Sequence, residues 1–270
     1  MENFTMDYYK YWEEFVEQWF KGNDNAIKGW SNPDMTPALC NTKGDTQSSL
    51  YIPEPWWGND GTKPLHSVVI NFNPGLGGQP QERERVPYYN SYAKDIINYK
   101  DGSNPKKWPN NTANWHYTRR AKPVQEQLGL TPSLESHLSI ELIPWHTAGV
   151  DNKNYGPYLE HNIEAVYKYS ICFAAHESKR IANNYLKNVV LLKMSGDFTK
   201  RLLQNMEKAH CCKHVIIAET DGTGKSDYLE FSLNTWPDVR FICIWGRYSQ
   251  NNFPVSQFKQ FFGAGGNARG

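Results

Sequence analysis

The first hydrophobic pattern in the chain has the spacing of a helix. Large apolar residues recur at helical intervals between positions 6 and 21, which predicts an amphipathic helix packed on the body of the protein. These residues are Tyr8, Tyr9, Trp12, Phe15, Val16, Trp19 and Phe20. Residues 22–65 show no lasting period and are rich in Asn, Asp, Gly, Pro and Trp, so we expect a long irregular connection there.

Five short apolar runs follow, and helical stretches lie between several of them. The runs cover residues 67–71, 138–143, 189–194, 214–218 and 239–244, and the helical stretches cover about 157–186 and 197–209. Continuous apolarity is typical of strands covered on both faces, and alternation with helices indicates parallel pairing. The pattern therefore predicts an α/β fold: a three-layer α/β/α sandwich around a mostly parallel sheet of four to five strands.

The length of 270 residues favours one domain with an elaboration over two equal domains. We expect a single α/β domain over residues 1–262, in which residues 1–66 form an N-terminal helix and irregular extension and residues 67–255 form the core. The Gly-rich residues 263–270 are expected to be a flexible tail.

Charge and cysteine content narrow the choice of partner and compartment. The 29 basic and 28 acidic residues produce no global field that would attract nucleic acid or an anionic membrane, so such contacts need a local patch. Five unevenly spaced cysteines fit a reducing compartment better than a disulfide framework. Neither a signal peptide nor a stretch of transmembrane length is visible, so we expect a cytoplasmic protein without membrane contact.

Ligand sites in parallel sheets lie outside the carboxyl ends of the strands, so the segments that follow the apolar runs matter most. The run 67–71 leads into Asn73-Pro74-Gly75-Leu76-Gly77-Gly78, whose glycines would let a ligand approach backbone N–H groups closely. The alternative interpretation of this segment is a tight structural turn.

This loop resembles the first active-site motif of the uracil-DNA glycosylase superfamily, particularly its single-strand-selective branch, where a strand ends in Asn-Pro-Gly-x-x-Gly-x-x-Gln. The matching residues are Asn73, Pro74, Gly75, Gly78 and Gln81. The resemblance implies that Asn73 positions the attacking water and that the other four residues line the base pocket. It also implies a DNA partner, single-stranded or with a flipped-out base, and a reaction that requires no metal or cofactor.

Two further motifs of that family are altered here. Glu141 stands where the family has a base-reading Asn, and because an ionised carboxylate only accepts hydrogen bonds, it would favour a base that presents N–H donors. In the last motif, Ser249 and Asn252 match the family pattern, but Arg247 replaces its His, which stabilises the charge on the departing base. Arg247 could supply that charge. Alternatively, Glu141 and Arg247 each pair with an oppositely charged group and have no catalytic task.

Other residues are candidates for contacts with the base or the DNA backbone. His146 follows the run 138–143 and could act as acid, base or hydrogen-bond donor, or be an ordinary solvent-bonded histidine. The segment 100–122 interleaves basic and aromatic residues, which is typical of single-strand binders but also of solvated loops. Its candidate contacts with the nucleic-acid backbone are Lys106, Lys107, Arg119 and Arg120.

Two other signals do not support a site. The segment from Asp221 to Ser226 ends like a phosphate-binding P-loop, but Glu219 occupies the position where that motif requires its first Gly. The adjacent Cys211 and Cys212, flanked by histidines, lack the spacing of a zinc site, so we expect no metal.

The leading hypothesis is a DNA-base glycosylase-like enzyme with altered base preference or reduced activity, expected to be a monomer. The first alternative is a non-catalytic protein that binds nucleic acid or a nucleobase on the same fold. A second alternative is an unrelated α/β enzyme that uses the glycine loop to bind a small phosphorylated or nucleoside substrate.

Overall fold

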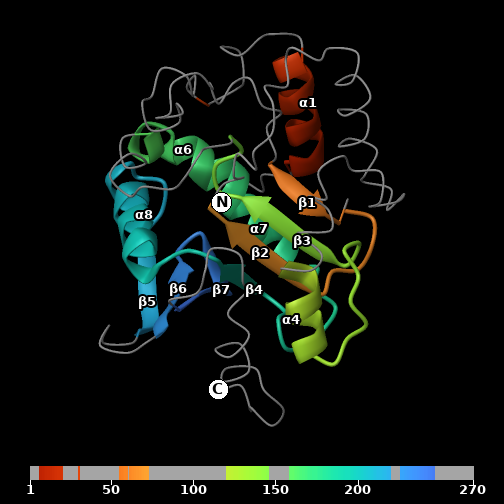
Figure 1. The fold of residues 1–270 in the computed structure, drawn as a ribbon. Helices are drawn as coiled ribbons and strands as arrows, with labels where there is room; N and C mark the ends of the chain where they lie inside the picture. Colours follow the sequence, from red (N-terminus) through yellow and green to blue (C-terminus); the bar gives the residue numbers. More distant parts are fainter. Residues whose placement is uncertain are drawn as a thin grey trace, which may run out of the picture.

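The fold is described from a computed structural model (Figure 1). The structure describes residues 6–20, 30, 55–59, 61–72, 120–145, 158–219 and 226–246. Its centre is one sheet of seven strands in the order β1-β3-β2-β4-β7-β6-β5. The strands are β1 (Trp56–Gly58), β2 (Ser67–Asn71), β3 (His137–Glu141), β4 (Val189–Leu192), β5 (His214–Glu219), β6 (Ser226–Leu233) and β7 (Trp236–Gly246).

Parallel pairing is confined to the middle of the sheet. Strands β3, β2, β4 and β7 are mutually parallel, whereas β1 lies antiparallel on β3, and β6 and β5 extend the other side as antiparallel strands. The α/β prediction is confirmed, but the sheet is mixed rather than mostly parallel, and the described residues supply seven strands rather than four to five.

The two strands missing from the sequence prediction have different local causes. Strand β6 alternates buried apolar residues (Leu229, Phe231 and Leu233) with polar ones, which is the pattern of an antiparallel strand rather than of a continuous apolar run. Strand β1 has only three residues and ends at Gly58, whose φ of +102° suits glycine. A Cβ there would collide with the carbonyl oxygen of His137.

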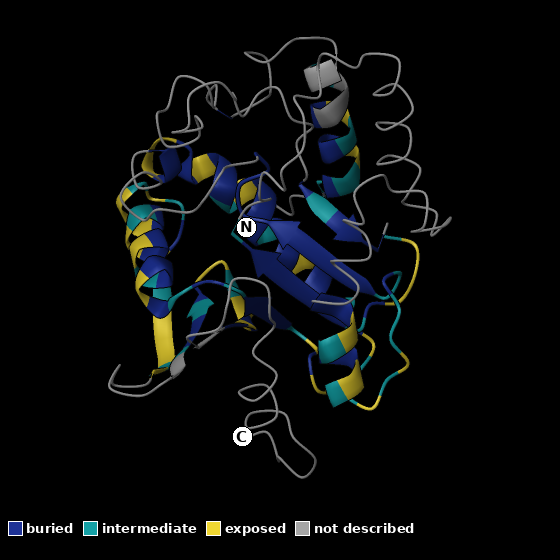
Figure 2. Ribbon diagram, viewed as in Figure 1, coloured by how far each residue is buried: buried dark blue, intermediate teal, exposed yellow. Residues whose placement is uncertain are grey.

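The helices of the described residues lie around this sheet. They are α1 (Tyr8–Phe20), α4 (Lys122–Gln127), α6 (Ile163–Ala165), the π-helix η8 (Val166–Ile171), α7 (Cys172–Ser178) and α8 (Gly196–Lys208). Helix α7 packs on β2 and β4, and α8 packs on β6 and β7. Strands β2, β3 and β4 are buried throughout, while α8 exposes one side (Figure 2).

Helix α1 confirms the amphipathic helix predicted for residues 6–21, and its aromatic face packs on η8 and α7. The Tyr8 ring stacks on Phe173 at 5.1 Å between centroids, and the Tyr11 ring stacks on Tyr169 at 3.8 Å. The hydroxyl of Tyr9 donates a hydrogen bond of 2.8 Å to the buried carboxylate of Glu177.

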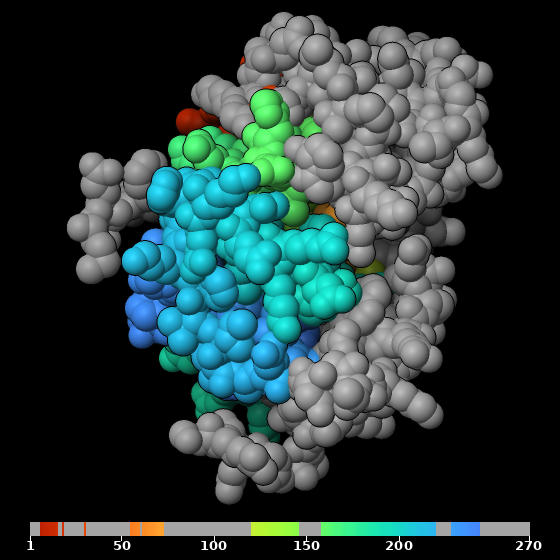
Figure 3. Space-filling model, turned by 90° about the vertical axis from the view of Figure 1, so that its left-hand side faces the viewer, coloured from red at the N-terminus to blue at the C-terminus, as the bar shows by residue number. Residues whose placement is uncertain are grey.

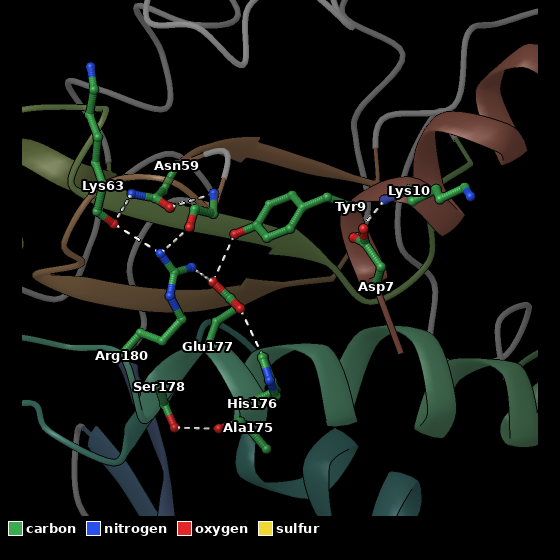
Figure 4. Close-up of polar contacts among 11 residues, drawn as sticks. Asp7, Tyr9, Lys10, Asn59, Lys63, Ala175, His176, Glu177, Ser178 and Arg180 are labelled. Carbon is green, nitrogen blue, oxygen red and sulfur yellow. Dashed lines mark hydrogen bonds and ion pairs between the residues drawn. The ribbon is translucent and has the colours of Figure 1, made fainter. Parts of the chain in front are cut away.

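The acceptor of that bond belongs to a polar cluster that ties α1, α7 and the connection before β2 together (Figure 4). Arg180 donates to Glu177 and to the carbonyl oxygens of Gly61 and Lys63. His176 shares a further hydrogen bond of 2.9 Å with Glu177. This cluster holds the N-terminal helix to the body of the protein.

Candidate functional site

One face of the neighbouring strands β2 and β3 is polar although it is buried. In the parallel register, Ser67 lies opposite His137 and Asn71 lies opposite Glu141, so these side chains point to the same face of the sheet. The polar residues of this face, none more than 4% exposed, are Ser67, Asn71, His137, Ser139 and Glu141. Buried polar groups are costly unless they are hydrogen-bonded, so their partners matter.

The amide of Asn71 is the centre of a hydrogen-bond network at the carboxyl ends of β2 and β3. Its Nδ2 donates to Ser139 Oγ at 2.7 Å and to Glu141 Oε1 at 3.1 Å. Its Oδ1 accepts from Arg120 Nε at 2.6 Å. These bonds fix which way the amide faces, and they link a buried carboxylate to a buried guanidinium through a neutral side chain.

The carboxyl end of β3 is also held by a contact from η8. Ser170, on η8, donates to the carbonyl oxygens of Glu141 and Leu142, at 3.3 Å and 3.1 Å. Because the hydroxyl reaches two consecutive carbonyls, the backbone position of Glu141 is constrained in addition to its side chain.

The amino-terminal half of the same polar face contains a neutral histidine. Ser67 Oγ and His137 Nδ1 share a hydrogen bond of 2.7 Å, while His137 Nε2 has no hydrogen-bond partner among the described residues. Complete burial and, to a smaller extent, the positive charge of Arg120 lower the pKa of His137 to about 3. The imidazole is therefore uncharged at neutral pH.

The segments that follow β2 and β3 leave the sheet side by side. Pairing continues past the strand ends, since Leu142 N–H donates to the Asn71 carbonyl at 2.9 Å and Ile143 N–H donates to the Phe72 carbonyl at 3.1 Å. The carboxyl end of β4 lies beside that of β2, since Lys193 N–H donates to the Ile70 carbonyl at 2.8 Å. The other parallel neighbour of β4 is β7, so the carboxyl ends of β2, β3, β4 and β7 all lie on one side of the sheet.

The segment after β4 leads into α8, which confirms the helical stretch predicted for about 197–209. Ser195 caps α8 by accepting a hydrogen bond of 3.2 Å from the backbone N–H of Phe198. The Phe198 ring meets the edge of the Phe72 ring at 4.4 Å between centroids. The start of α8 therefore packs directly against the residue that follows β2.

Most residues predicted for the site lie outside the described residues. They are Asn73, Pro74, Gly75, Gly78, Gln81, Lys106, Lys107, Arg119, His146, Arg247, Ser249 and Asn252. Of the predicted set, Glu141 and Arg120 are described, and the structure brings both to the Asn71 network.

Arg120 requires a correction. The sequence predicts it as a contact with the nucleic-acid backbone, but it is 2% exposed and its Nε is bonded to Asn71. A phosphate backbone is contacted from an exposed surface, and the buried guanidinium instead supports the carboxyl end of β2. Glu141 is the last residue of β3 and is 2% exposed.

Four residues of the polar face are missing from the sequence prediction: Ser67, Asn71, His137 and Ser139. The signal was present in β3, where His137, Ser139 and Glu141 alternate with Leu138 and Ile140. Interpreting the run as continuously apolar from residue 138 hides this alternation.

The described residues contain no group of three or more His, Cys, Asp or Glu side chains suited to a metal ion, and no helix among them is long and apolar enough to cross a membrane. Near the adjacent cysteines, His214 is paired with Glu207 at 2.9 Å. Burial, followed by the nearby Cys211, raises the pKa of Cys212 to about 12, which disfavours the thiolate that binds metal. Comparison of the chain with protein-family models, curated proteins and solved structures finds no match.

Proposed function

We propose that the protein is a DNA-base glycosylase-like enzyme that hydrolyses the N-glycosidic bond of a flipped-out base, with altered base preference or reduced activity. The observation that supports this best is the buried bond from Asn71 to Glu141, at the point where the two principal candidate segments leave the sheet. The proposal extends to the fold, with β3, β2, β4 and β7 as the core of a uracil-DNA glycosylase-like sandwich.

The orientation of the Asn71 amide bears on base preference. Because Oδ1 accepts from Arg120, the amide presents N–H groups to Glu141, so Glu141 acts as an acceptor within the network. An acceptor beside the base pocket suits a base edge with N–H donors and disfavours the carbonyls of uracil. We therefore propose an altered substrate rather than ordinary uracil excision.

The proposed reaction uses residues that follow the strand ends. A water held by Asn73 attacks C1′ of the extruded nucleotide while the bond to the base breaks, and the sugar passes through an oxocarbenium-like state. Arg247 stabilises the negative charge that develops on the departing base. Pro74, Gly75, Gly78 and Gln81 line the pocket, and His146, Ser249 and Asn252 complete it.

Incubation with single-stranded oligonucleotides that carry uracil, hypoxanthine or xanthine tests the proposal, with abasic sites detected by alkaline cleavage. We expect abasic sites on at least one substrate, and their loss in Asn73→Ala without a change in Tm. Asn184→Ala is the matched control, because Asn184 is exposed in the connection before β4. The enzymatic proposal is wrong if no substrate is cleaved, and Asn73 has no role in it if Asn73→Ala retains full turnover.

A second candidate function is binding of nucleic acid without turnover, favoured by the replacement of the family's Asn and His by Glu141 and Arg247. It predicts salt-dependent binding of single-stranded DNA. Lys106→Ala and Lys107→Ala should each reduce the slope of log K against log salt by about 0.7. Lys187→Ala is the control, because Lys187 precedes the amino-terminal end of β4, whereas the candidate site lies at the carboxyl ends of the strands. Absence of binding to DNA, RNA and nucleosides would exclude this candidate.

A further inference from the structure

Strand β5 is the outermost strand of the sheet and exposes three consecutive aliphatic side chains. Among the described residues no strand pairs with its outer edge. Val215 is 62% exposed, Ile216 40% and Ile217 52%, although edge strands are usually protected by charges or a covering element. Figure 2 shows β5 as an exposed strand, and in Figure 3 the surface of α8 and β5 faces the viewer.

This exposed strand is held firmly in place by α8. Lys200 of α8 forms an ion pair with Glu219 at 2.6 Å, and Glu207 of α8 accepts a hydrogen bond of 3.1 Å from the backbone N–H of His214. These two contacts lie at opposite ends of β5, so α8 fixes both ends of the segment that carries the three aliphatic residues. A preformed edge binds another strand with a smaller loss of conformational entropy than a flexible one.

The backbone of β5 presents hydrogen-bonding groups on its outer side. Lys213 N–H donates to Asn234 Oδ1 at 2.7 Å, and Asn234 N–H donates to the Lys213 carbonyl at 2.9 Å, so the backbone groups of Lys213 face β6. His214 N–H instead donates to Glu207 Oε1 at 3.1 Å. Since the direction alternates along a strand, the N–H and C=O of Ile216 point away from β6.

We propose that this edge binds a second copy of the chain, with the two β5 strands antiparallel about a two-fold axis at Ile216. In that arrangement the two Ile216 residues exchange N–H···O=C bonds, and Val215 of each copy lies opposite Ile217 of the other. Isologous pairing needs only one self-complementary patch, and it places a side chain of the second copy beside each of the three exposed aliphatic side chains.

Charge complementarity supports a second copy as the occupant. Lys213, which is exposed, precedes β5, and Glu219, which also pairs with Lys200 of its own chain, ends it. The strand therefore has a cation at one end and a carboxylate at the other. Antiparallel pairing about Ile216 places the Lys213 end of each copy beside the Glu219 end of its mate. Parallel pairing would bring like charges together.

The interface is small and the dimer is weak. The register between β5 and β6 shifts between Ile216 and Ala218, and such bulges shorten the regular edge available to a partner. We therefore expect the monomer that the sequence predicts at low concentration and a reversible dimer as concentration rises. The inference does not depend on the proposed glycosylase activity.

Sedimentation velocity over about 1–300 µM protein tests the dimer, a range suited to interfaces below standard size. The weight-average sedimentation coefficient should rise with concentration for the wild type and stay at the monomer value for Ile217→Lys. Tyr185→Lys is the matched control, since Tyr185 is 58% exposed but lies in the connection before β4. It should behave as the wild type.

A charge-reversal pair distinguishes antiparallel pairing from nonspecific association. Lys213→Glu and Glu219→Lys each place like charges at both ends of the homodimer, so each variant alone should dimerise more weakly than the wild type. An equimolar mixture restores opposite charges at both ends and should dimerise again. The proposal is overturned if the wild type stays monomeric, if Ile217→Lys still dimerises, or if mixing has no effect.

Discussion

Asn71 and Glu141 lie directly opposite each other on two parallel strands, and the amide of the first donates to the carboxylate of the second over 3.1 Å. Both side chains are buried, and both residues end their strands just before the backbone enters the candidate site. The bond therefore couples the two segments on which the proposed function depends. Mutating Asn71 tests the contribution of this bond to stability, and mutating Glu141 tests its contribution to function.

Asn71→Leu tests the structural part of this relationship. Leucine has a similar size but takes one hydrogen-bond partner away from each of Arg120, Ser139 and Glu141. We expect the free energy of unfolding to fall by about 3 kcal/mol, as is usual when buried polar and charged groups lose partners. Urea denaturation measures it. Asn184→Leu, at an exposed position, should change stability by less than about 0.5 kcal/mol.

Glu141→Gln tests the functional part and depends on the proposed glycosylase activity. Glutamine keeps an oxygen for Asn71 but adds an N–H donor, so base edges with carbonyl acceptors should become better substrates. We expect the ratio of kcat/KM for uracil, which has a carbonyl at C4, over cytosine, which has an amino group there, to rise about 10-fold or more. Glu160→Gln, on an exposed side chain paired with Lys208, should leave the ratio unchanged. An unchanged ratio in Glu141→Gln would remove this residue from base recognition.

The sequence predicted those parts of the fold that have a strong and simple hydrophobic period. The limits of β2 were correct, and the helix with Trp12 and Phe15 on its buried face formed as expected, because both patterns are set by local burial. Strand β5 was predicted as the run 214–218, whereas β6 was missed because it alternates polar and apolar residues. Strand β1 is too short to show a period.

The candidate site shows a different limit of sequence analysis. Its position at the carboxyl ends of β2 and β3 followed from general rules for parallel sheets, whereas the Asn71 network did not. Arg120 is distant from Asn71 in sequence, and no local pattern shows that a cation in a basic, aromatic stretch turns into the protein interior. Contacts of this kind depend on tertiary packing, which residue type and spacing alone do not specify.

His137 makes folding stability depend on pH. Its pKa is about 3 in the folded protein against 6.5 in the unfolded chain, so the unfolded state binds more protons between these values. Stability is therefore lost as pH falls from 6.5 toward 3, by up to about 1.4 kcal/mol per pH unit from this residue. In urea denaturation between pH 7 and pH 4, His137→Gln should lose less stability than the wild type. His161→Gln, at an exposed position, should retain the wild-type dependence.

The contact between Tyr9 and Glu177 determines how firmly α1 is held. Tyr9→Phe keeps the ring, which packs edge-on against Trp56 and Phe173, and removes only the hydroxyl that donates to Glu177. We expect a loss of about 1–2 kcal/mol, as for a hydrogen bond to a charged group, because Glu177 keeps its bond from Arg180. Tyr185→Phe, whose hydroxyl is on an exposed ring, should be neutral within about 0.5 kcal/mol. Faster hydrogen exchange confined to residues 8–20 would show that the loss acts on α1, whereas equal losses in the two variants would show that the hydroxyl bond does not anchor the helix.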